Sequence, residues 1–379
     1  MTGAASRPSA FQPLYRTVFA NIRIAEFLGL YAVALILAGL GDALLCVDKA
    51  RCAWPYVDTW KLHQFVFAYD DLGFAKRALL GSVLGLDDAT STESATVVAL
   101  SVVFLLAFSA LLLAFSFSLP RVYRLLMVAS PAVFLQAGFD LGRIDQLNYA
   151  LALLILLSPW RWAIMAAPLM VLAHEGVFLI HLPVLFAGHW LVHGPSRAAA
   201  VAFAFSATAL AAVLAFGGLD PGLDVGGLYT AMTSSSYAML SLTLSGNFGF
   251  VGERAAWADG FYWTCLIVAA AYAALIFLLL RPMLACGRLL GSPIYLAAFA
   301  PLLLSLIGID WPRWVACVVV NLFILACVAQ AKAGGGSAPG RPSGTVKIGL
   351  IAAFAAAVAG PVGDATPLPL IVAIRDFLL

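Results

Sequence analysis

The sequence predicts an all-α membrane protein that crosses the bilayer about ten or eleven times. Of its 379 residues, 63% are hydrophobic and only 11% are charged, whereas a soluble domain carries about 25% charged residues. Apolar runs of about 20 residues recur along the chain, and this length crosses a hydrocarbon core of roughly 30 Å. The runs lack the alternation of polar and apolar residues that marks the strands of a membrane β-barrel.

Eleven apolar runs, several of them short, form the expected transmembrane helices. They lie at about residues 24–45, 95–119, 122–138, 144–158, 160–174, 176–193, 198–217, 260–280, 289–307, 313–331 and 347–363. We therefore expect a single multi-span membrane domain over residues 1–379. The first 23 residues contain three arginines and no acid, and they lack a small-residue cleavage site. They indicate a cytoplasmic tail rather than a removed signal peptide.

The region from Leu147 to Trp190 can be divided in two ways. A two-span division makes 163–186 one helix and buries His174 and Glu175 in mid-bilayer, whereas a three-span division breaks the chain near 173–176. Cytoplasmic loops are enriched in Lys and Arg. The three-span division places twelve of the 21 Lys and Arg residues at the inner face and leaves nearly all acids outside or at outer helix ends. It is therefore preferred.

This layout predicts a bacterial inner (plasma) membrane protein with a cytoplasmic N-terminus and an extracytoplasmic site. Two larger extracytoplasmic loops are expected at 46–94 and 218–259, and a Gly-rich flexible cytoplasmic linker at 331–346. The first loop contains a stretch that can form amphipathic helices lying in the membrane interface. The second has the composition of a mobile flap or of a passive cover. A Cys46–Cys52 disulfide is consistent with the oxidising side, and it remains one of two alternatives.

The stretch FDLGRIDQ, at residues 139–146, places Asp140, Arg143 and Asp145 between two apolar runs. Such a group can be a capped helix start with an internal ion pair. Ionisable groups at the edge of a short span are costly, however, and they usually serve function. A second D-x-x-R pattern, Asp310 and Arg313 in GIDWPRW, occupies a later outer turn. Asp140 and Asp145 are catalytic candidates, and the arginines and Asp310 are phosphate- or substrate-binding candidates.

Two further groups fall in outer segments. Asp70 and Asp71 are catalytic candidates because a carboxylate there can accept a proton from a sugar hydroxyl, although a solvated turn is the alternative. Lys76 and Arg77 follow closely and are candidates for phosphate binding, or for snorkelling at the interface.

His174 and Glu175, at another outer turn, are candidate ligands of a divalent cation such as Mg²⁺ or Mn²⁺. The alternative is a polar pair that stabilises a helical hairpin. His181 lies seven residues after His174, and in the three-span layout it does not reach the outer site.

The sequence also excludes several classes of function. It contains no P-loop, no G-x-S-x-G nucleophile motif and no dinucleotide-binding fingerprint. A cytosolic nucleotide substrate is therefore not expected. The net charge of +2 gives no indication of nucleic-acid binding. Membrane lipids are the expected surroundings, and no protein partner is identified.

This arrangement resembles the GT-C class of integral-membrane glycosyltransferases over residues 1 to about 195. Asp70–Asp71 stand where that class has a first-loop acid, and Asp140 and Asp145 stand where a second acidic site follows. The resemblance implies transfer of a sugar from a polyprenyl-phosphate carrier to a glycan, lipid or protein acceptor. It implies an inverting displacement in which Asp70 or Asp71 deprotonates the acceptor and arginines steady the departing phosphate.

Three other functions remain open from the sequence. A polysaccharide polymerase or ligase of the cell envelope would use the same lipid carrier and face. A transporter or flippase of a lipid-linked or small polar substrate would need charged groups within its spans and alternating access. A non-catalytic assembly subunit is the third.

Overall fold

The computed structural model describes residues 14–46, 55, 57–86, 91–220, 222–229, 251–253, 255–256, 258–286, 293–333 and 344–378. Cys52, most of the expected flap at 218–259 and the centre of the linker at 331–346 lie outside these residues.

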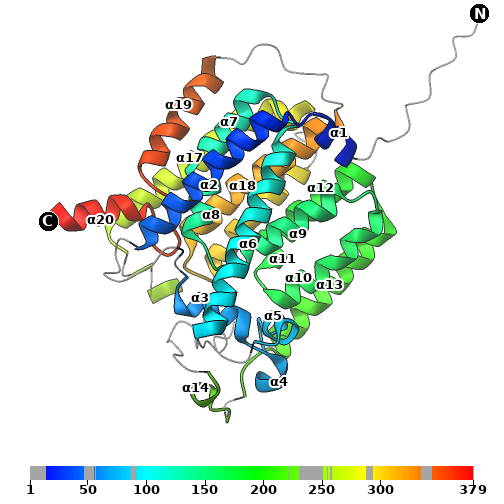
Figure 1. The fold of residues 1–379 in the computed structure, drawn as a ribbon, viewed down its shortest axis with the longest axis vertical. Coiled ribbons are helices and arrows are strands. Elements are labelled where there is room, and N and C mark those ends of the chain that lie inside the picture. Colours follow the sequence, from blue (N-terminus) through cyan, green and yellow to red (C-terminus); the bar gives the residue numbers. More distant parts are fainter. Residues whose placement is uncertain are drawn as a thin grey trace, which may run out of the picture.

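Within the described residues the chain is a helical bundle, as the sequence predicts (Figure 1). The helices long and apolar enough to span a membrane are α2 (Ile24–Cys46), α6 (Ser91–Ser116), α13 (Arg197–Phe216), α17 (Gly260–Cys286) and α18 (Trp311–Lys332). A sixth candidate is a bent pair of helices, which is either one broken span or a re-entrant loop. It consists of α7 (Arg121–Ala129) and, after a bend of 42°, the π-helical turn η1 (Pro131–Leu135) with α8 (Gln136–Phe139). The shorter apolar helices are α9 (Asp145–Leu157), η2–α10 (Arg161–Ala166 and Ala167–Ala173), α12 (Leu182–His193), η4 (Pro293–Leu306) and α19 (Gly344–Val358).

Each of these helical units coincides with one apolar run of the sequence. The region between Leu147 and Trp190 forms three separate helical segments, which agrees with the three-span division. Helix α10 ends at Ala173, and His174 is extended before α11 (Val177–Ile180) begins. The bend after α7 has a local cause as well, because Ser130 precedes a proline and is held in the extended region.

Helix α18 forms the centre of the bundle. Every residue from Trp311 to Ala331 is buried, and α17, η4 and α12 pack around it. Its sequence is apolar on all sides, which is typical of a helix surrounded by protein. The polar residues at its first turn therefore enter the interior with it.

Two glycines bring α2 against the bent pair of helices. A Cβ on Gly41 would lie 1.9 Å from the carbonyl oxygen of Leu135, and one on Gly138 would lie 1.8 Å from that of Ala38. Any larger residue would force the two backbones apart. This close approach fixes the position of α8, and Asp140 follows directly after that helix.

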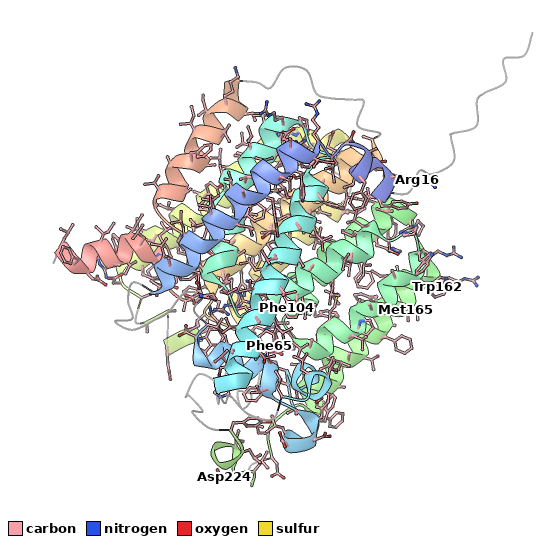
Figure 2. The ribbon with its side chains drawn as sticks, viewed as in Figure 1. Arg16, Phe65, Phe104, Trp162, Met165 and Asp224 are labelled. Carbon is pink, nitrogen blue, oxygen red and sulfur yellow. The ribbon has the colours of Figure 1, made fainter. Side chains whose placement is uncertain are left out.

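The first large loop covers one end of the bundle with α3 (Thr59–Val66), α4 (Tyr69–Leu72) and α5 (Leu79–Leu84). The expected helices are present, but α3 packs on protein: residues 61–67 are all buried. Phe65 stacks on Phe104 of α6 with ring centroids 6.3 Å apart (Figure 2). Beyond this loop lies the short helix α14 (Val225–Leu228).

The opposite end of the bundle carries basic residues. Arg124 of α7 pairs with Glu26 at the start of α2, at 2.8 Å. Ser118, close by in the chain, donates to the carbonyl of Cys327 near the far end of α18. The described part of the chain begins with α1 (Leu14–Ala20) and ends with the amphipathic α20 (Pro369–Leu378). The separation of the two ends agrees with the predicted layout, and the side that faces the cytoplasm stays a prediction.

Candidate functional site

The two D-x-x-R patterns meet at one end of the bundle. Arg143 lies 3.1 Å from Asp140, and Arg313 lies 2.7 Å from Asp310, each three residues apart in the chain. The pairs are also joined to each other, because Arg143 donates to the same Asp310 oxygen at 3.1 Å. Asp140 follows the end of α8 and does not open a helix, so the cluster is a turn between two helices rather than a capped helix start.

Asp145, the first residue of α9, forms a further ion pair with Arg313. Its Oδ2 accepts from Nε of Arg313 at 3.0 Å. A carboxylate at this position is also favoured by the helix dipole. Its other oxygen, Oδ1, is buried and accepts no hydrogen bond from the described residues. That oxygen is available to a water molecule or to a hydroxyl group.

Lys61 and Trp60, both on α3, contact the turn that carries Asp140 and Arg143. Lys61 is 1% exposed, and its Nζ donates to the carbonyl oxygens of Phe139 and Leu141 at 3.3 and 2.9 Å. The lysine thus caps the carboxyl end of α8. The guanidinium of Arg143 lies over the Trp60 ring, 4.6 Å from its centroid. The tryptophan holds that guanidinium in a fixed plane.

Asp364, in the segment between α19 and α20, joins the same group of charged residues. Its carboxylate accepts from Nη2 of Arg143 at 3.3 Å. Gln136 of α8 exchanges two hydrogen bonds with the backbone of Gly363, at 2.9 and 3.1 Å. Neither Lys61 nor Asp364 is among the site residues expected from the sequence. Lys61 lies in a stretch predicted to be interfacial, and no motif surrounds Asp364.

We call the seven charged residues of this group the network: Lys61, Asp140, Arg143, Asp145, Asp310, Arg313 and Asp364. It contains three cations and four carboxylates. Asp140, Arg143 and Asp145 are each 7% exposed and Arg313 is 5% exposed. Ionic groups with so little water are costly, and their geometry must compensate.

Burial shifts the proton affinities of two members. Burial raises the pKa of Asp140, against the opposing effect of Arg143, Arg313 and Lys61. Burial also lowers the pKa of Lys61 to about 8, and Arg143 lowers it further, while nearby aspartates act in the opposite direction. Among the carboxylates of the network, Asp140 is thus the one whose pKa is raised.

A cavity of about 40 Å³ adjoins the network. It is lined by Asp140, Asp145, Arg313 and Gln146 and by apolar residues of α6, η1 and α18. This volume is large enough for a water molecule or a hydroxyl group. The cavity thus offers two carboxylates to a single hydroxyl-sized group.

Arg77 and Glu175 form a second, separate ion pair. Two nitrogens of Arg77 donate to the Glu175 carboxylate at distances of 2.6–3.2 Å. Burial alone would raise the pKa of Glu175, but Arg77, and then His174, lower it well below its usual range. The pair joins the first loop to the turn after α10. Lys76 adds a backbone hydrogen bond to Gly217.

The histidines lie closer to the network than the layout predicts. Burial lowers the pKa of His174 to about 4, and its Nδ1 accepts from the backbone of Gly176 at 3.0 Å. His181 was expected not to reach the outer site, and this expectation is wrong. It is fully buried near enough to Asp145 for the two to interact electrostatically. The break at Gly176 is followed by a helical turn that points His181 inward, against the Tyr149 ring at 4.2 Å.

Asp70 and Asp71 lie on α4 and are exposed. Asp71 accepts a hydrogen bond from the hydroxyl of Tyr229 at 3.0 Å. Among the described residues, no ion pair or hydrogen bond connects either aspartate to the network. The structure therefore brings together Asp140, Arg143, Asp145, Asp310 and Arg313, and it leaves Asp70 and Asp71 in a different group.

The expected cation ligands do not form a metal site. In the described part of the chain, no three His, Cys, Asp or Glu side chains are grouped to hold a metal ion. Glu175 is paired with Arg77, and the aspartates of the network are paired with arginines. The donor set of His174 and Glu175 thus does not fit Mg²⁺ or Mn²⁺, which prefer several oxygen ligands.

Comparison with known proteins gives no match: no protein-family model, curated protein or solved structure is significantly similar to this chain. The sequence and structure establish a polytopic helical membrane protein.

Proposed function

We propose that this protein is a membrane glycosyltransferase that takes a sugar from a polyprenyl-phosphate carrier and acts at the network. One observation carries the proposal. Arg143 and Arg313 are buried at one end of an apolar bundle and converge with Asp140, Asp145 and Asp310 from two separate turns. Buried charges at a membrane edge generally serve a function. A transferase of this kind needs cations for the leaving phosphate and a carboxylate for the acceptor.

Asp140 is the base in this proposal. A general base works best when its pKa lies near the operating pH, and burial raises the pKa of Asp140. It also lines the cavity that accommodates one hydroxyl-sized group. The acceptor hydroxyl gives its proton to Asp140 as its oxygen bonds to the anomeric carbon. This role replaces the one that the resemblance gives to Asp70 or Asp71.

The bond from the anomeric carbon to the phosphate oxygen breaks in the same step. Its electrons leave with the phosphate, which gains a second negative charge. Arg143 and Arg313 stabilise that charge by charge-assisted hydrogen bonds. Asp310 bridges the two arginines and positions them relative to each other. No step requires a metal ion.

The test is release of polyprenyl phosphate by purified protein in liposomes, measured by mass spectrometry over a panel of polyprenyl-phosphate sugars. Asp140→Asn should lower kcat about 10²–10⁴-fold in protein that remains folded. Asp376→Asn, on exposed α20, is the matched control and should leave turnover unchanged. If Asp71→Asn abolishes turnover and Asp140→Asn does not, the base lies in the first loop. Absence of release from every donor by folded protein would contradict the transferase.

Two rivals can be separated in the same preparation. A polymerase or ligase would also release carrier phosphate, but its product would grow with the length of the acceptor glycan. A transporter is favoured by one observation, the fully buried polar residues His181 and Asn321, for which the proposed transfer has no role. It would move a labelled lipid across the liposome membrane without releasing carrier phosphate.

The proposed orientation places the network outside the cell and the N-terminus in the cytoplasm. It can be tested with single cysteines at exposed positions of the two ends, in a background without native cysteines. Asp70→Cys should react with an impermeant maleimide in intact cells, and Trp160→Cys, on the turn between α9 and η2, should not. The reverse pattern would place the network in the cytoplasm and contradict an extracytoplasmic site.

A further inference from the structure

The segment between α19 and α20 folds into a hairpin that lies on the network. The backbone of Leu368 donates to the carbonyl of Val362 at 2.8 Å, and Gly363 and Pro367 form a β-bridge. The turn requires a glycine, because Gly363 has a φ of +103° and a Cβ there would lie 2.0 Å from the carbonyl oxygen of Thr366. We call residues 360–368 the C-terminal hairpin.

A few polar contacts hold this hairpin in place. Gln136 bonds both backbone groups of Gly363, and the Tyr262 hydroxyl donates to the carbonyl of Ala365 at 3.1 Å. Asp364 supplies the ionic contact, to Arg143 at 3.3 Å. The hairpin begins at Gly360 and ends at Leu368, both with positive φ. It is therefore attached through two sharp backbone bends rather than through a continuous helix.

Asp364 is the least strongly held carboxylate on Arg143. Its distance of 3.3 Å exceeds the 3.1 Å of Asp140 and of Asp310. Asp310 is bound by Arg313 as well, whereas Asp364 has Arg143 as its single ionic partner among the described residues. The Asp364 side chain is also 27% exposed, against 9% for Asp140. An anion arriving from outside would replace Asp364 first.

We propose that Asp364 occupies the position of the substrate's phosphate on Arg143, and that the C-terminal hairpin is a lid displaced by an anionic lipid phosphodiester. This inference rests on the proposed function for the identity of the lipid. A sugar–phosphate–polyprenyl diester carries one negative charge, as does an aspartate. Exchange of one for the other leaves the net charge of the buried network unchanged, so binding requires no additional buried charge. The Trp60 ring keeps Arg143 in place during the exchange.

Removal of the competing carboxylate should strengthen lipid binding. The probes are polyprenyl phosphate and phosphatidylglycerol, titrated into full-length protein in detergent and followed by native mass spectrometry, at a pH below about 6, where polyprenyl phosphate is mostly a monoanion like the diester. Asp364→Asn should lower the Kd for polyprenyl phosphate about tenfold, since a self-occupied site reduces apparent affinity by the fraction that is open. Asp376→Asn, in the same C-terminal region but paired with Arg375, should bind as the wild type does. Arg143→Gln should lose binding.

Each outcome decides one part of the inference. An unchanged or weaker Kd in Asp364→Asn overturns the lid, since Asp364 then only supports the fold. Equal tightening for phosphatidylglycerol supports the lid but makes the ligand an ordinary phospholipid, and it contradicts the proposed transferase instead. If Asp364→Asn does not fold, hydrogen exchange in the wild type provides the test. Polyprenyl phosphate should accelerate exchange at Gly363 and Leu368, and unchanged protection of both amides overturns the lid.

Discussion

The network and the Asp70–Asp71 pair are both acidic groups near the same end of the chain's bundle, yet they have opposite environments. The network aspartates are paired with arginines, both within a turn and across separate segments, and Asp140 and Asp145 are buried. Asp70 and Asp71 are exposed on a single short helix, and the neighbour of Asp71 is a neutral hydroxyl. Two adjacent acids are by themselves a weak sequence motif. The physical constraint is much stronger in the first.

The comparison teaches that the number of acids in a motif says little about how tightly a group is held. What matters is how many separate segments must meet to neutralise it. Four segments of the chain converge on Arg143, counting its own turn, α3, the start of α18 and the C-terminal hairpin. Among the described residues, the side chain of Asp71 accepts one hydrogen bond, from Tyr229.

The largest expected difference comes from removing a cation of the network. Arg313→Ala leaves Asp145 buried without its ionic partner, while Asp310 keeps Arg143, and loss of one member of a buried pair costs about 3–5 kcal/mol. The free energy of unfolding in mild detergent should fall accordingly. Arg375→Ala, which breaks an exposed pair with Asp259, is the control and should be nearly neutral. The double variant Arg313→Ala/Asp145→Asn should recover part of the loss, and equal stability of Arg313→Ala and wild type would contradict the comparison.

The next effect concerns the backbone that carries Asp140. Gly41→Ala places a methyl group against the carbonyl oxygen of Leu135, and such overpacking costs about 1–3 kcal/mol. Gly29→Ala is the matched control on the same helix, because nothing lies within 4 Å of its Cβ position. Unfolding of both variants in detergent measures the difference. If Gly41→Ala is as stable as Gly29→Ala, α2 and α8 do not pack closely and the position of Asp140 is not fixed by them.

Lys61 predicts a dependence of stability on pH. Its pKa is lowered from 10.5 to about 8 in the folded protein, so the unfolded chain binds more protons between these two values. The stability of the wild type relative to Lys61→Met should therefore rise with pH over this window, by up to about 1.4 kcal/mol per unit. Below pH 8 the relative stability should be constant. Melting temperatures of both proteins between pH 7 and 10 provide the measurement, and a decline with pH would contradict the burial of this lysine.

The smallest effect is expected at the first loop. Asp71→Asn weakens one hydrogen bond at the protein surface, and the free energy of unfolding should change by less than about 1 kcal/mol. Tyr229→Phe removes the same bond from the other side, together with the bond that the backbone of Ala68 donates to this hydroxyl. Asp71→Asn should therefore have no further effect in the Tyr229→Phe background. If the free energy of unfolding fell by several kcal/mol in Asp71→Asn, the difference between the first loop and the network would be contradicted.

Much of the fold follows from hydrophobicity. All eleven runs became helical units, and the break after Ala173 agrees with the division that charge favoured. The sequence also predicted that five charged residues would lie at one end, because every second turn of a helical bundle lies at the same end. They are Asp140, Arg143, Asp145, Asp310 and Arg313.

The positions of Lys61, Asp364 and His181 depend on tertiary packing. Lys61 gives no sequence signal because a lysine in an amphipathic segment normally faces solvent, and only its contact with the carbonyls of α8 shows its role. Asp364 follows the last apolar run without a motif. His181 was misplaced because a four-residue helix, α11, redirects the chain within one turn. Pairing between distant segments cannot be read from local pattern.

The central position of α18 also has a consequence for biosynthesis. Asp145 and its partner Arg313 are 168 residues apart in the chain. At about 5–20 residues per second, a ribosome needs roughly 10–30 s to make that interval. During this time Asp145 is already in the nascent protein and its cation does not yet exist. The earlier helices must therefore remain open, or be held by the insertion machinery, until α18 arrives and the bundle closes around it.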